Sequence, residues 1–150
     1  MTLAMSIAVL LAASMLTDAQ IVDLFALTES RMDHAAVGDR GRARSAWQIH
    51  HAAWEDVSEW RKVQGLPVYQ YRIGTRDPEK SRAYAGDYLE IVAMQLRDRM
   101  KRRPTLEELW CGWNLGVVGF ERRKFRVSKT PQTTRDGVVR MQNIKQEKGW

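Results

Sequence analysis

The chain has 150 residues, 44% hydrophobic and 28% charged, which predicts one globular domain with a core of its own. Its single cysteine, Cys111, excludes an internal disulfide framework, and the three histidines show no metal-ligand spacing, so we expect no metal and no other cofactor. Lys and Arg outnumber Asp and Glu by 24 to 18, and this excess favours a polyanionic partner such as nucleic acid, an anionic membrane or an anionic cell wall.

Residues 1–16 contain no charged side chain and are too short for a stable membrane span. They fit either a secretory signal peptide, with small residues at Ala12 and Ser14, or a buried first helix. We favour the signal and export to the periplasm or cell envelope, because a helix cap at Thr17 is a natural start for a mature domain spanning 17–150. A structural helix would instead suit a cytoplasmic or phage-encoded protein.

A helix is predicted from Thr17, which forms a capping box with Gln20. Ile21, Phe25 and Glu29 follow at i, i+4 and i+8, so a carboxylate lies on the apolar stripe, near the negative end of the helix dipole. Both surroundings disfavour ionisation and should raise the pKa of Glu29, as a general acid requires. The alternative is a solvated carboxylate at a frayed helix end.

The rest of the chain predicts further helices around one irregular segment. Residues 32–52 are punctuated by glycine and suit a loop or a small hairpin. One helix is expected from about His50 to Val63, and a longer one from a cap at Asp77 to the arginines before Pro104. A third begins at a capping box formed by Thr105 and Glu108. The last is expected over about 133–146, with Thr133 as its cap. The fold class is therefore mainly α, with five to seven helices and a minor hairpin near 38–49.

Two basic clusters follow the longer helices: Arg97, Arg99, Lys101, Arg102 and Arg103, and then Arg122, Arg123, Lys124 and Arg126. Cations at a helix C-terminus also complement the helix dipole. No nucleic-acid-binding motif accompanies them, so we expect non-specific attraction to a polyanion and no specific nucleic-acid partner.

Three motifs occur in order: Glu29-Ser30; then Gly38-Asp39-Arg40-Gly41 with Ala43 and Trp47-Gln48-Ile49; then Trp113-Asn114-Leu115-Gly116. Together they resemble the lysozyme-like superfamily, in which a Glu-Ser pair ends a helix and a glycine-rich loop with Gln-Ile follows. Gly-Asp-Arg-Gly is similar to goose-type lysozymes, and the last motif resembles the Tyr-Asn-x-Gly of lytic transglycosylases. The resemblance implies a lysozyme-like α-helical domain.

The chain departs from that pattern at four positions. Ser45 stands where the family usually has glycine, and Trp47 where it has methionine or tyrosine. Trp113 replaces the usual tyrosine and lacks a hydroxyl that could hydrogen-bond the catalytic carboxyl. His50 occupies the place of an additional aspartate of goose-type enzymes.

The resemblance implies cleavage of peptidoglycan glycan strands at the β-1,4 bond between N-acetylmuramic acid and N-acetylglucosamine, with Glu29 as general acid and base. Gln48 and Asn114 would line the cleft. Ser30 would bind near the carboxyl or cap the helix, and Trp47 and Trp113 would stack on sugars or belong to the core. The candidate second carboxylate is Asp39, whose alternative is an Asx turn before Gly41.

Two other functions stay open: a non-catalytic peptidoglycan-binding relative, and a basic helical protein that binds nucleic acid. For the enzyme, one secure acid favours the transglycosylase reaction, in which the muramic 6-hydroxyl replaces water, over hydrolysis as in lysozyme.

Overall fold

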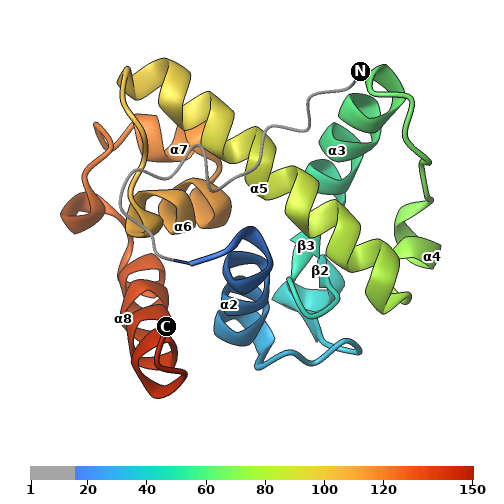
Figure 1. Ribbon diagram of the computed structural model, residues 1–150, viewed down its shortest axis with the longest axis horizontal. Coiled ribbons are helices and arrows are strands. Elements are labelled where there is room, and N and C mark those ends of the chain that lie inside the picture. The colour runs from blue at the N-terminus through green and yellow to red at the C-terminus, as the bar shows by residue number, and fades with distance from the viewer. Residues whose placement is uncertain (1–15) are drawn as a thin grey trace.

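The computed structural model describes residues 16–150, which are mainly helical with one small antiparallel sheet (Figure 1). The described α-helices are α2 Asp18–Ser30, α3 His51–Val63, α4 Tyr71–Gly74, α5 Pro78–Met100, α6 Leu106–Leu115, α7 Val117–Glu121 and α8 Gln132–Glu147. The strands β1 Val37–Gly38, β2 Ala43–Arg44 and β3 Ile49–His50 pair in that order, with the 3-10 turns Asp39–Gly41 and Val127–Lys129 outside them. The predicted mainly α class with a minor hairpin is confirmed.

The predicted signal peptide or first helix over 1–16 lies outside the described residues, apart from Leu16. Export and localisation therefore stay predictions. Within 16–150, no helix combines the length and the apolar character that a bilayer crossing requires.

Local capping explains where several helices begin. Thr17 and Gln20 form the predicted box, with the Gln20 N–H donating to Thr17 Oγ1 at 3.2 Å and the Thr17 N–H donating to Gln20 Oε1 at 2.8 Å. Thr105 and Glu108 form the same box at α6, and Asp77 caps α5. The predicted cap at Thr133 is wrong: α8 begins one residue earlier, after Pro131, with no side-chain cap.

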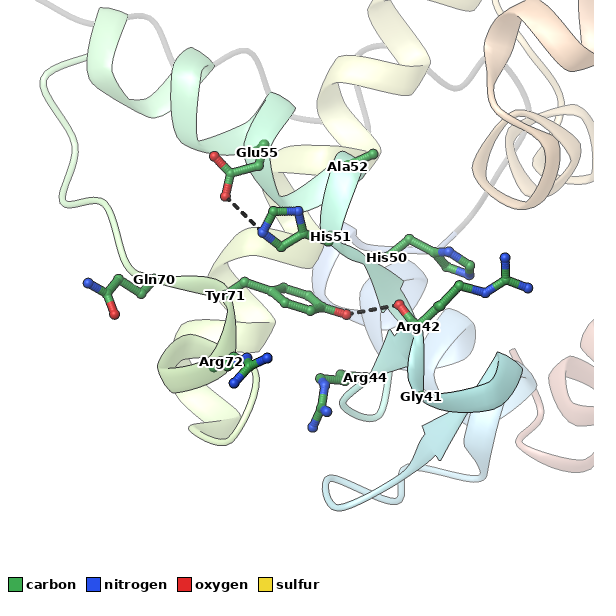
Figure 2. A pocket seen from close by; sticks show the side chains of 10 residues that line it. All are labelled: Gly41, Arg42, Arg44, His50, His51, Ala52, Glu55, Gln70, Tyr71 and Arg72. Atoms are coloured by element: carbon green, nitrogen blue, oxygen red, sulfur yellow. Dashed lines mark hydrogen bonds and ion pairs between the residues drawn. The ribbon is translucent and has the colours of Figure 1, made fainter.

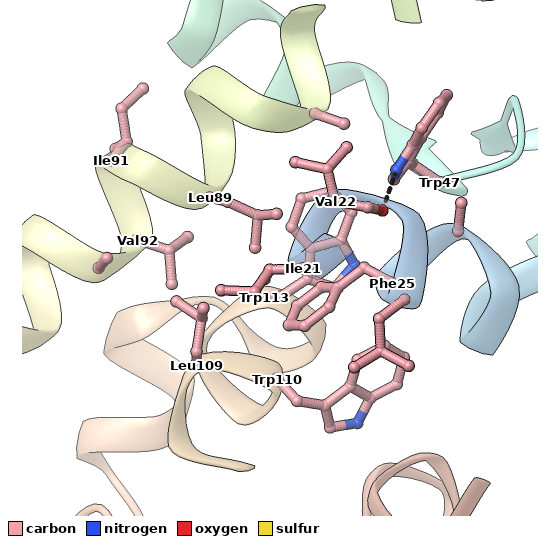
Figure 3. Packing of buried hydrophobic residues seen from close by; sticks show 14 of the residues in the cluster. Ile21, Val22, Phe25, Trp47, Leu89, Ile91, Val92, Leu109, Trp110 and Trp113 are labelled. Carbon is pink, nitrogen blue, oxygen red and sulfur yellow. Dashed lines mark hydrogen bonds between the residues drawn. The ribbon is translucent and has the colours of Figure 1, made fainter. Parts of the chain in front are cut away.

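The long helix α5 crosses the middle of the molecule and separates two groups of elements (Figure 1). The sheet, α3 and α4 lie toward one of its ends, while α6, α7 and α8 lie on the other side, with α2 between. The core joins them: Phe25 of α2 meets Trp110 and Trp113 of α6 edge to face, with ring centroids 5.3 and 5.6 Å apart (Figure 3). Glu29 follows Phe25 by one turn, so this packing fixes its place.

Two helical glycines permit the close packing around α6. A Cβ on Gly112 would lie 2.8 Å from Val92 Cγ1 of α5, so glycine permits α6 to approach α5 closely there. A Cβ on Gly137 of α8 would lie 2.5 Å from the Trp110 ring. Glycine at this position therefore lets α8 approach the Trp110 indole closely.

Candidate active site

Glu29 occupies the last turn of α2, directly before the left-handed cap residue Arg31. Its side chain is partly buried, and the carboxyl oxygen Oε1 accepts a hydrogen bond from the indole N–H of Trp113 at 3.0 Å. Trp113 itself is only 7% exposed. The structure thus joins two residues that the sequence motifs place far apart in the chain.

Burial raises the pKa of the Glu29 carboxyl from 4.5 to about 7, and this desolvation outweighs the hydrogen bond from Trp113 and the charge of Arg140, which both lower it. The direction agrees with the prediction from the apolar stripe. Near neutral pH the carboxyl is therefore present in both protonation states, which is the condition for donating and later accepting a proton.

Trp113, which stands where the resembled family has tyrosine, gives the carboxyl a hydrogen-bond partner. The sequence suggested a lost hydroxyl, but the indole nitrogen supplies the donor at the same carboxyl. The edge-to-face contact with Phe25 holds the indole.

Three of the predicted substrate-binding residues line one cavity of about 340 Å³: Gln48, Trp113 and Asn114. Tyr88 and Asp56 also line it, and Glu29 is connected to it through Trp113. Glu29 and Ser30 themselves line a second cavity, of about 700 Å³, between the ends of α2 and α8. The hydrogen bond from Trp113 to Glu29 therefore connects the two cavities.

Ser30 binds the loop and not the Glu29 carboxyl. Its hydroxyl donates to the Ala46 carbonyl oxygen at 2.7 Å and accepts from the Asp33 N–H at 3.0 Å. These bonds attach the end of α2 to the segment that carries Gln48. Ser30 is thus a residue that positions the loop relative to Glu29.

Gln48 and Asn114 are each held by one neighbour. Gln48 Nε2 donates to the Ser45 carbonyl oxygen at 2.9 Å, and its Oε1 lies where a Cβ on Gly38 would be, only 2.1 Å away. Asn114 is exposed, and its Oδ1 accepts from the Thr134 hydroxyl at 2.8 Å. The Asn114 amide nitrogen has no hydrogen-bond acceptor among residues 16–150, so it is free for a ligand.

Trp47 belongs to the core, so its interpretation as a sugar-stacking wall is wrong. It is 1% exposed, and its indole N–H donates to the Val22 carbonyl oxygen at 2.8 Å (Figure 3). No face of the ring is open to a ligand. Nearby, Ser45 adopts a φ of 71°, the left-handed region in which glycine is favoured, as the family pattern has at this position.

Asp39 lies in the turn between β1 and β2, beside Arg42 and His50. Its Oδ1 accepts from Arg42 Nη2 at 3.0 Å, and its Oδ2 lies 3.4 Å from His50 Nε2. The expected Asx turn does not form in this part of the described chain, because the carboxylate faces these two side chains. Whether Asp39 is a second catalytic carboxylate stays a prediction.

Sequence reasoning missed three residues at the site: Asp56 and Tyr88, which line the cavity, and Arg140. Tyr88 of α5 lines the cavity with its ring 4.9 Å from Trp113, and burial raises the pKa of its hydroxyl to about 12, which keeps it neutral. Arg140 of α8 faces the Glu29 carboxyl. Tyr88 lies four residues from both Tyr84 and Val92, a helical spacing that is visible in the sequence. Nothing in the sequence near Arg140 relates that residue to Glu29.

Residues 16–150 hold no group of three His, Cys, Asp or Glu side chains arranged for a metal ion, and the expectation of no metal stays a prediction. Comparisons with known proteins add nothing to the motifs. No family model, curated protein or solved structure matches this chain.

Proposed function

We propose that this protein cleaves the glycan strands of peptidoglycan at the β-1,4 bond between N-acetylmuramic acid and N-acetylglucosamine, with Glu29 as the catalytic acid. The observation that carries this proposal is the Glu29 carboxyl, whose pKa burial raises to about 7 beside a cavity lined by Gln48, Trp113 and Asn114. A surface carboxylate with a purely structural role is not expected to be buried in a way that raises its pKa toward neutrality. The lysozyme-like motifs supply the substrate class.

The reaction begins with proton transfer from protonated Glu29 to the glycosidic oxygen as the C–O bond breaks. The bonding electrons leave with that oxygen, and an oxocarbenium-like transition state forms at the anomeric carbon. Glu29 is then a carboxylate, which the Trp113 N–H and the Arg140 charge stabilise. It next accepts a proton from the oxygen nucleophile that bonds to the anomeric carbon.

The nucleophile that the site favours is the 6-hydroxyl of the same muramic acid, as in lytic transglycosylases. Hydrolysis would need a second catalytic carboxylate beside the sugar. Both oxygens of the predicted one, Asp39, already face Arg42 or His50, and the other candidate is Asp56, which lines the cavity of Gln48, Trp113 and Asn114. The intramolecular route needs only Glu29 and neutral groups that hold the sugar, which Gln48, Asn114 and Tyr88 offer. We therefore favour the transglycosylase over the lysozyme-type hydrolase.

The test is digestion of purified peptidoglycan by wild type, Glu29→Gln and the control Glu147→Gln. Glu147 lines the same α2–α8 cavity but is exposed. We expect soluble fragments from wild type and control and none from Glu29→Gln, with 1,6-anhydro-muramic ends seen in mass spectra as products lighter by one water. Cleavage by Glu29→Gln at the wild-type rate would refute the proposed acid.

Other results would assign other functions. Reducing ends together with loss of activity in Asp39→Asn or in Asp56→Asn would indicate a hydrolase. Binding to peptidoglycan without cleavage by wild type would indicate a non-catalytic module, and salt-dependent DNA binding without peptidoglycan binding would indicate a nucleic-acid partner.

A further inference from the structure

A separate cavity of about 660 Å³ lies where the sheet, the start of α3 and α4 meet (Figure 2). Its lining includes three arginines: Arg42 and Arg44 from the turn and strand around β2, and Arg72 from α4. Figure 2 shows Arg44 and Arg72 on the same side of the Tyr71 ring, whereas Arg42 extends toward His50.

Two of these positive charges are not compensated. Arg42 binds Asp39 at 3.0 Å, and the acid in the lining, Glu55, lies 3.5 Å from His51. Within residues 16–150, neither Arg44 nor Arg72 forms an ion pair or a side-chain hydrogen bond. The cavity therefore presents two free guanidinium groups, which match carboxylates and phosphates in geometry.

The frame that carries these arginines is held together by Tyr71. Its hydroxyl donates to the Ile49 carbonyl oxygen at 2.7 Å and lies 3.0 Å from the Arg42 carbonyl oxygen, while its ring meets His51 edge to face at 5.0 Å. This fixes α4, which bears Arg72, against the sheet, which bears Arg44. A ligand would thus find the backbones of both arginines already in place.

The basic cavity also adjoins the proposed substrate cleft. His50 and Ala52 line both this cavity and the one that contains Gln48, Trp113 and Asn114. A glycan strand in the cleft would bring its substituents to the arginines. The anionic substituents of peptidoglycan strands are the free carboxylates of the peptides attached to muramic acid.

We propose that Arg44 and Arg72 bind a carboxylate of the peptides that substitute the glycan strand, so that the protein prefers peptide-bearing strands to bare ones. This inference rests on the proposed function for its substrate. The same guanidinium groups could meet phosphate on wall polymers, and the experiment separates that source.

The test measures binding in the Glu29→Gln background, so that cleavage does not consume the ligand. Co-sedimentation is compared on peptidoglycan freed of phosphate polymers, on the same material after an amidase has removed its peptides, and on walls that keep their phosphate polymers. The amidase leaves a free lactyl carboxylate on each muramic acid, so the second material tests whether the arginines distinguish the carboxylates of the peptides from one on the sugar. The variant is Arg44→Gln with Arg72→Gln. The matched control is Arg122→Gln with Arg126→Gln, which removes two exposed arginines near α7, on the side of the molecule away from α4 (Figure 1).

We expect the Arg44/Arg72 variant to bind peptide-bearing peptidoglycan on the order of tenfold more weakly than its parent, the factor that one hydrogen bond to a charged group supplies. Binding to peptide-free strands should change no more than in the control. Arg72→Gln alone, at an exposed position, should show part of the loss, and it serves if the double variant fails to fold.

Equal losses in variant and control, or equal losses with and without peptides, would overturn the inference. A loss confined to walls that keep phosphate polymers would assign the arginines to phosphate and also overturn it. Cleavage by wild type decides the proposed function separately: cleavage without peptide preference refutes only this inference, and peptide-dependent binding without cleavage refutes only the enzyme.

Discussion

Replacing Glu29 by glutamine should make the folded protein more stable at alkaline pH while removing the proposed acid. The reason is the same burial that raises the pKa of the carboxyl from 4.5 to about 7. Ionising such a group in the folded state costs on the order of 3 kcal/mol relative to the unfolded chain. Glutamine keeps the shape and an oxygen that can accept from Trp113, but it carries no charge to desolvate.

The pH range of the effect follows from the two pKa values. Below 4.5 the carboxyl is protonated in both folded and unfolded chains, so wild type and Glu29→Gln should unfold with similar free energies. Between 4.5 and about 7 the unfolded chain releases its proton while the folded protein keeps it, and wild-type stability falls as pH rises. Above about pH 7 the free energy of unfolding of Glu29→Gln should exceed that of wild type by the full amount.

Urea unfolding at about pH 4, 6 and 8 measures this difference as a change in midpoint at constant slope. Glu147→Gln serves as the control, because that exposed carboxyl should give a small difference at every pH. If Glu29→Gln and wild type differ by the same amount at pH 4 and pH 8, the carboxyl is not desolvated and the reasoning fails.

Two further substitutions test the groups that act on Glu29, with the pKa of its carboxyl followed by NMR titration of labelled protein. Trp113→Phe removes the hydrogen-bond donor and should raise the pKa of Glu29 above its wild-type value. The control Trp110→Phe removes an indole N–H that donates to the Thr134 carbonyl oxygen, and it should leave the pKa of Glu29 unchanged. An unchanged pKa in Trp113→Phe would contradict the hydrogen bond from Trp113. Arg140→Gln removes a nearby positive charge and should also raise the pKa of Glu29, by an amount that decreases as salt is added. The control Lys148→Gln, from the same cavity, should leave that pKa unchanged. A lowered pKa in Arg140→Gln would show that Arg140 does not stabilise the Glu29 carboxylate.

The elements that could be predicted from sequence are those whose boundaries are set by nearby residues. Local hydrogen bonds form the capping boxes at Thr17 and Thr105 and the cap at Asp77. The first residues of α2, α6 and α5 could therefore be predicted from residues that are close in sequence. The helical turn α4 was not predicted, because contacts distant in sequence hold it, above all the Tyr71 hydroxyl on the Ile49 carbonyl. A four-residue helix has no periodicity to detect.

The candidate site also has one feature that could be predicted from nearby residues and one that could not. Burial of Glu29 follows from its place on the apolar stripe of α2, since Phe25 one turn earlier is fully buried. Trp47 and Trp113 could not be told apart, because both are buried tryptophans with a paired indole N–H, one on the Val22 carbonyl and the other on the Glu29 carboxyl. Only the packing of α2 against α6 decides which indole reaches the acid.

The tryptophan at position 113 also determines where the acid carries its proton. A tyrosine hydroxyl can donate to a carboxylate or accept from a protonated carboxyl, whereas an indole N–H only donates. Because Trp113 donates to Oε1, the proton of the acid form belongs on Oε2, and Oε1 serves as the fixed acceptor before and after proton transfer. The bond favours the ionised form, yet burial outweighs it and holds the pKa near 7. A tryptophan donor at this position is therefore compatible with the proposed general acid, and it predicts that Oε2 is the oxygen that would donate the proton to the glycosidic oxygen in the proposed reaction.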